Sequence, residues 1–114
     1  MSNKQPNLYE GMYIISAKLS DEARKKTFEK ITNGISSRGG ELRRIHEQGR
    51  RKLAYEIKSH REGYYYLVYF TLAPALIKEL WDEYQISEDL VRFVTMRIEE
   101  DEVLEKLEFK TLAE

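Results

Sequence analysis

Apolar and polar residues alternate with two different periods along the chain, and the changes of period predict a series of strands and helices. The aromatic and β-branched run over 8–16 is typical of a strand. From Ala23 to Ile35 apolar residues recur at helical spacing, with Ser20 as the expected N-cap and Gly39-Gly40 as the stop. The chain is therefore predicted to begin with a strand and a helix.

The next two segments return to the strand period of two. Residues 41–58 are predicted to form one long strand in which Gly49 marks a bulge. The polar stretch 59–63 is predicted to turn the chain, and residues 64–72 are the most strongly β-prone segment. These two segments predict a long antiparallel strand pair.

A second helix and a last strand complete the pattern. Pro74 stands where a first helical turn tolerates proline, an apolar stripe follows as far as Tyr84, and residues 90–98 predict the last strand. The order strand, helix, strand, strand, helix, strand predicts an α+β fold, the ferredoxin-like sandwich, with a four-stranded antiparallel sheet and two helices on one face. The other face would be bare, and the fold alone does not say what it binds.

Length and composition narrow the class of protein. A chain of 114 residues suits one domain, which we place at 8–98 between an N-terminal extension (1–7) and an acidic C-terminal extension (99–114). The absence of cysteine excludes disulfides and cysteine-ligated metal centres. No apolar run approaches the roughly 18–20 residues of a membrane span, and residues 1–7 lack a signal-peptide core, so we expect a cytoplasmic protein without a membrane partner.

The net charge of −1 hides a strong asymmetry. Residues 1–60 hold 13 Lys and Arg against 7 Asp and Glu, whereas residues 61–114 hold 6 against 13. Most charge runs are simply solvated surface. Clustered cations also suit phosphate oxygens, which arginine can bind bidentately. The candidate RNA-binding residues are Arg43, Arg44, Arg50, Arg51, Lys52, Lys58 and Arg92.

Strand geometry divides the densest of these cations between two faces. A period of two sends Arg50 and Lys52 to one face and Arg51 to the other, alongside Leu53 and Tyr55. Burying an unpaired arginine is costly, so Arg51 is expected near the strand end, outside the covered region.

Aromatic residues of the third strand offer a second candidate for RNA contact. Tyr64 and Tyr66 occupy positions at which RNA-recognition-motif proteins carry base-stacking rings. Glu62 and Tyr65 depart from that motif, and packing in the core is the alternative role for both rings.

Catalysis has little support in the sequence. His46 and His60 show neither a metal-ligand spacing nor a triad arrangement. Glu79 and Glu83 are one helical turn apart and are expected to form a solvated helix face. Because a glycine-rich phosphate loop is also missing, we predict no enzyme, no cofactor, no metal and no small-molecule substrate.

The basic strand carries a specific resemblance. Its run Gly49-Arg50-Arg51-Lys52-Leu53-Ala54-Tyr55-Glu56-Ile57-Lys58 resembles the G-x-R-[RK]-L-A-Y-x-I signature of the bacterial small-subunit ribosomal protein six family. Tyr9-Glu10, Gly63-Tyr64-Tyr65 and Val91-Arg92-Phe93-Val94 follow the same family. The signature carries over onto Gly49, Arg51, Leu53, Ala54, Tyr55 and Ile57. We expect Leu53, Tyr55 and Ile57 to pack in the fold.

The resemblance implies a structural constituent of the small ribosomal subunit. It further implies binding to the central domain of small-subunit ribosomal RNA, as a heterodimer with small-subunit ribosomal protein eighteen. One alternative is a protein-interaction module of the same fold without an RNA role, using the apolar surplus at Val68, Phe70, Val94 and Met96. Another is a single-strand binder of the RNA-recognition-motif type.

Overall fold

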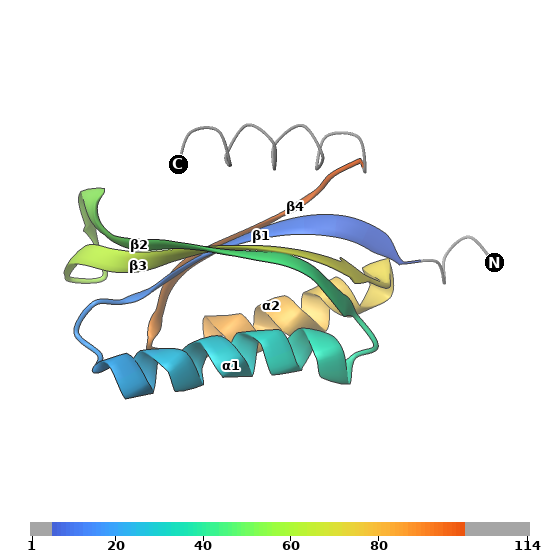
Figure 1. Cartoon of the computed structure of the whole chain (residues 1–114), viewed down its shortest axis with the longest axis horizontal. Coiled ribbons are helices and arrows are strands. Elements are labelled where there is room, and N and C mark those ends of the chain that lie inside the picture. The colour runs from blue at the N-terminus through green and yellow to red at the C-terminus, as the bar shows by residue number, and fades with distance from the viewer. Residues whose placement is uncertain (1–5, 100–114) are drawn as a thin grey trace.

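A computed structural model of the chain describes residues 6–99. Its elements are β1 (Asn7–Ser16), α1 (Asp21–Ser37), β2 (Glu41–Ile57), β3 (His60–Leu72), a 3₁₀ turn η2 (Pro74–Leu76), α2 (Ile77–Gln85) and β4 (Leu90–Arg97). The four strands form one antiparallel sheet in the order β2-β3-β1-β4, and both helices cover the same face (Figure 1). The predicted α+β ferredoxin-like fold is confirmed.

The first helix begins and ends where the sequence predicts. The Ser20 hydroxyl accepts a hydrogen bond from the Ala23 backbone N–H at 3.2 Å, and Asp21 and Glu22 place negative charge in the first turn. After the helix, Gly39 adopts a φ of +83°, a left-handed conformation that suits glycine. Within residues 6–99, no helix is long and apolar enough to cross a membrane.

The core lies between the sheet and the two helices. Tyr13, Val68 and Phe70 are fully buried there. The hydroxyls of Tyr13 and Tyr84 lie 2.9 Å apart, so each buried phenol finds a partner and β1 is linked to α2. The predicted contact patch is therefore wrong for Val68 and Phe70, which face the helices. Only Val94 and Met96 lie on the opposite face.

The turn between β2 and β3 is tighter than predicted. Lys58 and Ser59 have φ values of 49° and 68°, as in a two-residue hairpin turn of type I′. His60 to Gly63 belong to β3, and His60, Glu62 and Gly63 pair with β2, so the prediction of a turn over 59–63 is wrong for these four residues. The polar side chains of His60, Arg61 and Glu62 are half-buried or exposed at the end of the hairpin, where a strand needs no apolar alternation.

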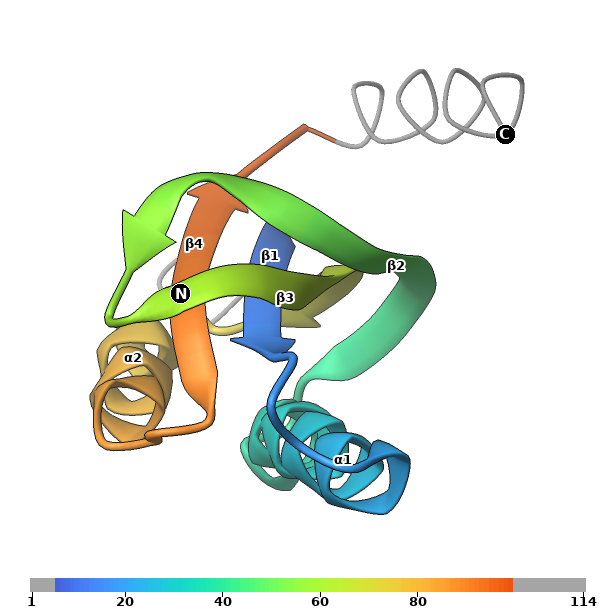
Figure 2. The same cartoon turned by 90° about the vertical axis from the view of Figure 1, so that its left-hand side faces the viewer.

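β2 and β3 extend well beyond the rest of the sheet. They have 17 and 13 residues, whereas β1 has 10 and β4 has 8. Their pairing shifts register three times, and Gly49 (φ +82°) lies at the second shift, which confirms the predicted bulge. Such bulges increase strand twist, and Figure 2 shows β2 arching from the α1 side of the sheet toward β4.

The two predicted extensions fall largely outside the described residues. Of the N-terminal extension only Pro6 and Asn7 are described, and Asn7 already pairs with Leu72 in the sheet. Of the acidic C-terminal extension only Glu99 is described. The domain limits at 8 and 98 stay a prediction.

Candidate nucleic-acid interface

The two tyrosines proposed as base stackers lie on the helix-facing side of β3. Tyr66 is buried and stacks on Phe28, with ring centroids 4.3 Å apart, so base stacking by Tyr66 is wrong and core packing explains it. The ring of Tyr64 is half-buried, and the guanidinium of Arg24 lies 4.0 Å from its centroid. Base stacking by Tyr64 finds no support in this arrangement.

Most of the candidate cations are open to solvent. Arg44, Arg51, Lys52 and Lys58 are exposed, and none of them forms an ion pair with another residue of the range 6–99. Arg51 lies outside the covered region, as predicted, and its Nε donates to the Gln48 carbonyl at 3.3 Å across the bulge. The second half of β2 therefore presents positive charge that is not paired with carboxylates of the described range.

Two other candidates have acidic neighbours. Arg50 donates from Nη2 to Glu62 Oε2 at 2.7 Å, and these two residues are diagonal neighbours on paired strands. This hydrogen bond and the carboxylate charge raise the pKa of Arg50 above its ordinary value. Arg43 makes a looser pair with Glu41, with Nε 3.9 Å from Oε2. Both arginines stay more than half exposed, so the pairs are open to exchange with other anions.

The family signature does not pack as expected. Leu53 and Ile57 are half-buried, but Tyr55 is 63% exposed, so the expectation that Tyr55 packs is wrong. Its hydroxyl accepts a hydrogen bond from Arg92 Nη1 at 3.1 Å. The arching hairpin thus brings the candidate cation of β4 to the end of β2. Tyr55 also lines a hollow of about 550 Å³ together with Lys52 and Arg61.

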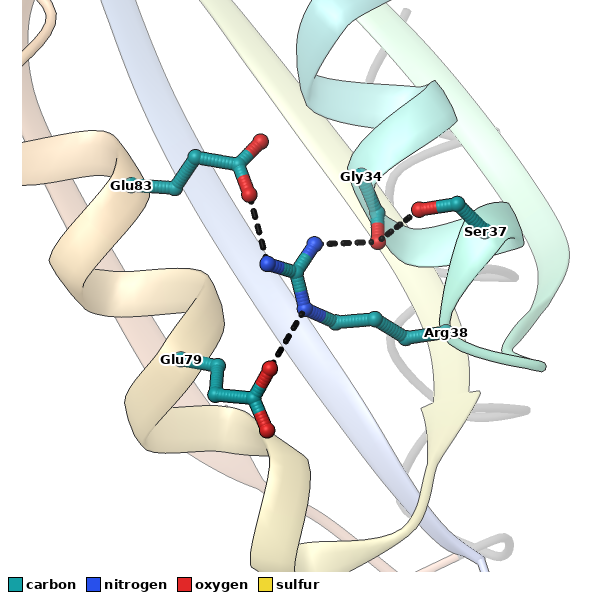
Figure 3. A network of polar contacts seen from close by, with 5 residues as sticks. All are labelled: Gly34, Ser37, Arg38, Glu79 and Glu83. Carbon is teal, nitrogen blue, oxygen red and sulfur yellow. Dashed lines mark hydrogen bonds and ion pairs between the residues drawn. The ribbon is translucent and has the colours of Figure 1, made fainter.

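Arg38, at the C-terminal end of α1, stabilises the packing of the two helices. Its Nη2 lies 2.6 Å from Glu83 Oε2, its Nε lies 3.7 Å from Glu79 Oε1, and its Nη1 donates to the Gly34 carbonyl at 2.9 Å (Figure 3). The side chain is only 19% exposed. We predicted that Glu79 and Glu83 form a solvated helix face. Both side chains are partly exposed, but they also form ion pairs with Arg38. These contacts, which we call the Arg38 clamp, join the end of α1 to α2.

Sequence reasoning missed this clamp because its partners are far apart in the chain. Arg38 and Glu83 are 45 positions apart, and only the packing of α1 beside α2 brings them together. The available signal was the one-turn spacing of Glu79 and Glu83, which presents two carboxylates to one side of α2.

The remaining polar groups of residues 6–99 show no catalytic arrangement. His60 Nδ1 lies 3.3 Å from the Ser16 hydroxyl, and the ring of His46 packs edge-on against Tyr69. Among residues 6–99 no three His, Asp or Glu side chains gather closely enough to hold a metal ion. What the described surface offers chemically is cations beside one exposed aromatic ring, an arrangement that suits a polyanion with stacking bases.

Comparison with known proteins settles the family. The family model described as "Ribosomal protein S6" matches residues 8–97. The chain belongs to the ribosomal protein S6 family. It is 62% identical to the small ribosomal subunit protein bS6 of Protochlamydia amoebophila, over all of this chain and 98% of the other. It is 55% identical to the bS6 protein of Chlamydia caviae over the full length of both.

A solved structure agrees with this assignment. The crystal structure of 30S ribosomal protein S6 from Thermotoga maritima superimposes with a TM-score of 0.79 at 32% identity, covering 95% of this chain and 99% of that one. As a member of the ribosomal protein S6 family, the chain is a structural component of the small ribosomal subunit in the cytoplasm and is not an enzyme. The predictions of the family, of a structural and non-enzymatic role, and of the location are confirmed.

Proposed function

We propose that the chain binds the central domain of small-subunit ribosomal RNA through the hairpin cations, by which we mean Arg51, Lys52, Lys58 and Arg61. The observation that carries the proposal is the exposure of all four, without an ion pair to any other residue in 6–99. Free guanidinium and ammonium groups bind phosphate oxygens and release the counterions condensed on RNA.

Tyr55 gives this surface a second kind of contact. The ring is the most exposed aromatic side chain of the described range, and its hydroxyl is fixed by Arg92. A ring held in place loses little freedom when a base stacks on it, and each base stacked on an aromatic side chain contributes about 1–3 kcal/mol. We assign to Tyr55 the stacking role that the sequence suggested for Tyr64 and Tyr66.

Salt dependence tests the role of the cations. Each phosphate neutralised contributes about −0.7 to −0.9 to the slope of log affinity against log salt. The Arg51→Glu/Lys52→Glu variant should lower affinity for a central-domain RNA fragment and flatten this slope by about two such steps. Lys25→Glu/Lys26→Glu on α1 is the matched control, because it changes the net charge equally on two adjacent exposed lysines.

The two variants separate a localised interface from general attraction. The proposal requires that the β2 variant loses affinity and slope while the α1 variant keeps most of both. Equal losses in the two variants would show diffuse attraction and contradict the proposal. Unchanged melting temperatures ensure that neither result comes from unfolding.

The proposed protein partner is small-subunit ribosomal protein eighteen, as the family resemblance implies. The sheet face opposite the helices supports a protein contact, because Met96 is 51% exposed there beside half-buried Met12 and Val94. Met96→Asp should abolish co-purification with this partner from nuclease-treated lysate. Ile86→Asp is the control, since Ile86 is 81% exposed at the end of α2. Retention of the partner by Met96→Asp would exclude this face.

A further inference from the structure

The turn between β2 and β3 meets the loop after β1 at a hollow of about 240 Å³. We call it the turn pocket, and its charged and polar lining consists of Lys18, Arg50, Ser59, His60, Arg61 and Glu62. It adjoins the hollow beside Tyr55, and Arg61 and Glu62 border both. The pocket draws cations from two regions of the chain that the family signature does not connect.

Hydrogen bonds hold the two walls of the turn pocket together. Ser16, which is only 3% exposed, accepts a hydrogen bond on its hydroxyl from the Lys18 backbone N–H at 3.1 Å and lies 3.3 Å from His60 Nδ1. Across the pocket, Lys18 Nζ donates to the carbonyl of Ser59 in the turn at 3.5 Å. The Lys18 ammonium is thus positioned over the turn before any ligand arrives.

The charge in the turn pocket is unbalanced. The single carboxylate, Glu62, is held by Arg50 at 2.7 Å, so these two charges neutralise each other. Lys18 and Arg61 are exposed and make no ion pair with residues 6–99, which leaves an excess of two positive charges before His60 is counted. A hollow with cationic donors and excess positive charge suits a small anion.

We propose that the turn pocket binds one backbone phosphate of RNA, with Lys18 and Arg61 as donors. This inference rests on the proposed RNA-binding function and extends it to the loop after β1. In the free protein the Glu62 carboxylate accepts a hydrogen bond from the Arg50 guanidinium, so it competes with the phosphate for that group. A phosphate bound between two chain segments sets the register of the RNA on the protein, whereas the exposed cations of β2 supply attraction.

Three single substitutions in the full chain test the turn pocket, with affinity for the central-domain fragment measured over a range of salt. Lys18→Gln should flatten the log–log salt slope by about 0.7–0.9, the contribution of one phosphate. Lys25→Gln, an exposed lysine on α1, is the matched control and should leave the slope unchanged. Glu62→Gln should strengthen binding about two- to fivefold, because it frees Arg50.

The outcomes separate this inference from the function on which it rests. If Lys18→Gln and Glu62→Gln change nothing while Arg51→Glu/Lys52→Glu weakens binding, the turn pocket is wrong and the hairpin cations stand. If none of these variants weakens binding, both proposals fail. Equal slopes for Lys18→Gln and Lys25→Gln also overturn the pocket. The proposal is also overturned if Lys18 is needed to bind an acidic peptide but not to bind RNA, because the ligand of the pocket would then be a protein.

Discussion

Arg92 on β4 donates a hydrogen bond to the hydroxyl of Tyr55 on β2 at 3.1 Å, although these two strands form opposite edges of the sheet. The contact exists because the β2–β3 hairpin outruns the sheet and twists across its open face (Figure 2). A residue of the family signature and a cation of the last strand therefore share one surface.

Removing the ring of Tyr55 should weaken RNA binding without altering its salt dependence. Loss of about 1–3 kcal/mol of stacking corresponds to about 5- to 150-fold in affinity. Tyr55→Leu should show this loss with an unchanged salt slope, because no charge is removed. Tyr55→Phe keeps the ring and should keep most of the affinity. If Tyr55→Leu binds as well as the unmodified chain, stacking by this ring is excluded.

The Arg38 clamp should matter for stability and not for RNA. Arg38→Met removes two ion pairs and the bond to the Gly34 carbonyl, and should lower the free energy of unfolding by about 1–2 kcal/mol. Arg43→Met, which breaks only a 3.9 Å contact between exposed groups, should cost about 0.5 kcal/mol or less. Urea denaturation measures both. Similar costs would show that Arg38 is an ordinary surface residue.

The bulge in β2 should depend on the backbone of Gly49. At a φ of +82°, Gly49→Ala should destabilise the fold by about 1–2 kcal/mol, since the site has open space for a Cβ and only the left-handed backbone is unfavourable. Gly49→Asn should cost less, because asparagine tolerates this conformation better. Thermal unfolding measures the stability of both variants. Equal stability of Gly49→Ala and the unmodified chain would contradict the dependence of the bulge on the Gly49 backbone.

The buried tyrosine pair should limit stability at alkaline pH. Burial raises the pKa of Tyr13 and Tyr84 above the ordinary phenol value of about 10. Folding therefore opposes their ionisation, so stability is intact below about pH 10 and falls as pH rises toward the raised values. The Tyr13→Phe/Tyr84→Phe variant should decline less steeply in urea denaturation above pH 10. Some decline should persist because burial also raises the pKa of Tyr66 and Tyr69. An identical decline in both proteins would contradict this role.

Local chemistry was enough to predict the elements of the fold. Ser20 caps α1 through a hydrogen bond to its side chain, and the bulge in β2 depends on the positive φ of Gly49. Both features are local, so both could be recognised from nearby residues. The hairpin turn was misplaced because His60, Arg61 and Glu62 are polar and a glycine follows them. Polar residues indicate a turn in a short hairpin, but they also occur in a long hairpin that projects into solvent.

The site was predicted less completely, because it depends on how strands pair and bend. Alternation placed Arg51 and Arg50 on opposite faces, as the register shows, but it could not pair Arg50 with Glu62 without the turn length. Tyr55 was expected to pack because alternation assumes that the cover of the sheet continues to the end of the strand. In the structure Tyr55 lies in the part of the hairpin beyond Gly63, the last residue of β3 that pairs with β1 in this direction, and only the tertiary structure reveals this.

Directed cleavage of ribosomal RNA tests the central claim most directly, and the absence of cysteine makes the chain suited to it. A single Ala54→Cys substitution, at an exposed position between the hairpin cations and Tyr55, would carry a tethered iron chelate into assembled small subunits. Asn33→Cys on exposed α1 is the control. We predict strong cleavage of the central domain from position 54 and little from position 33. Cleavage from position 33 with none from position 54 would contradict the account.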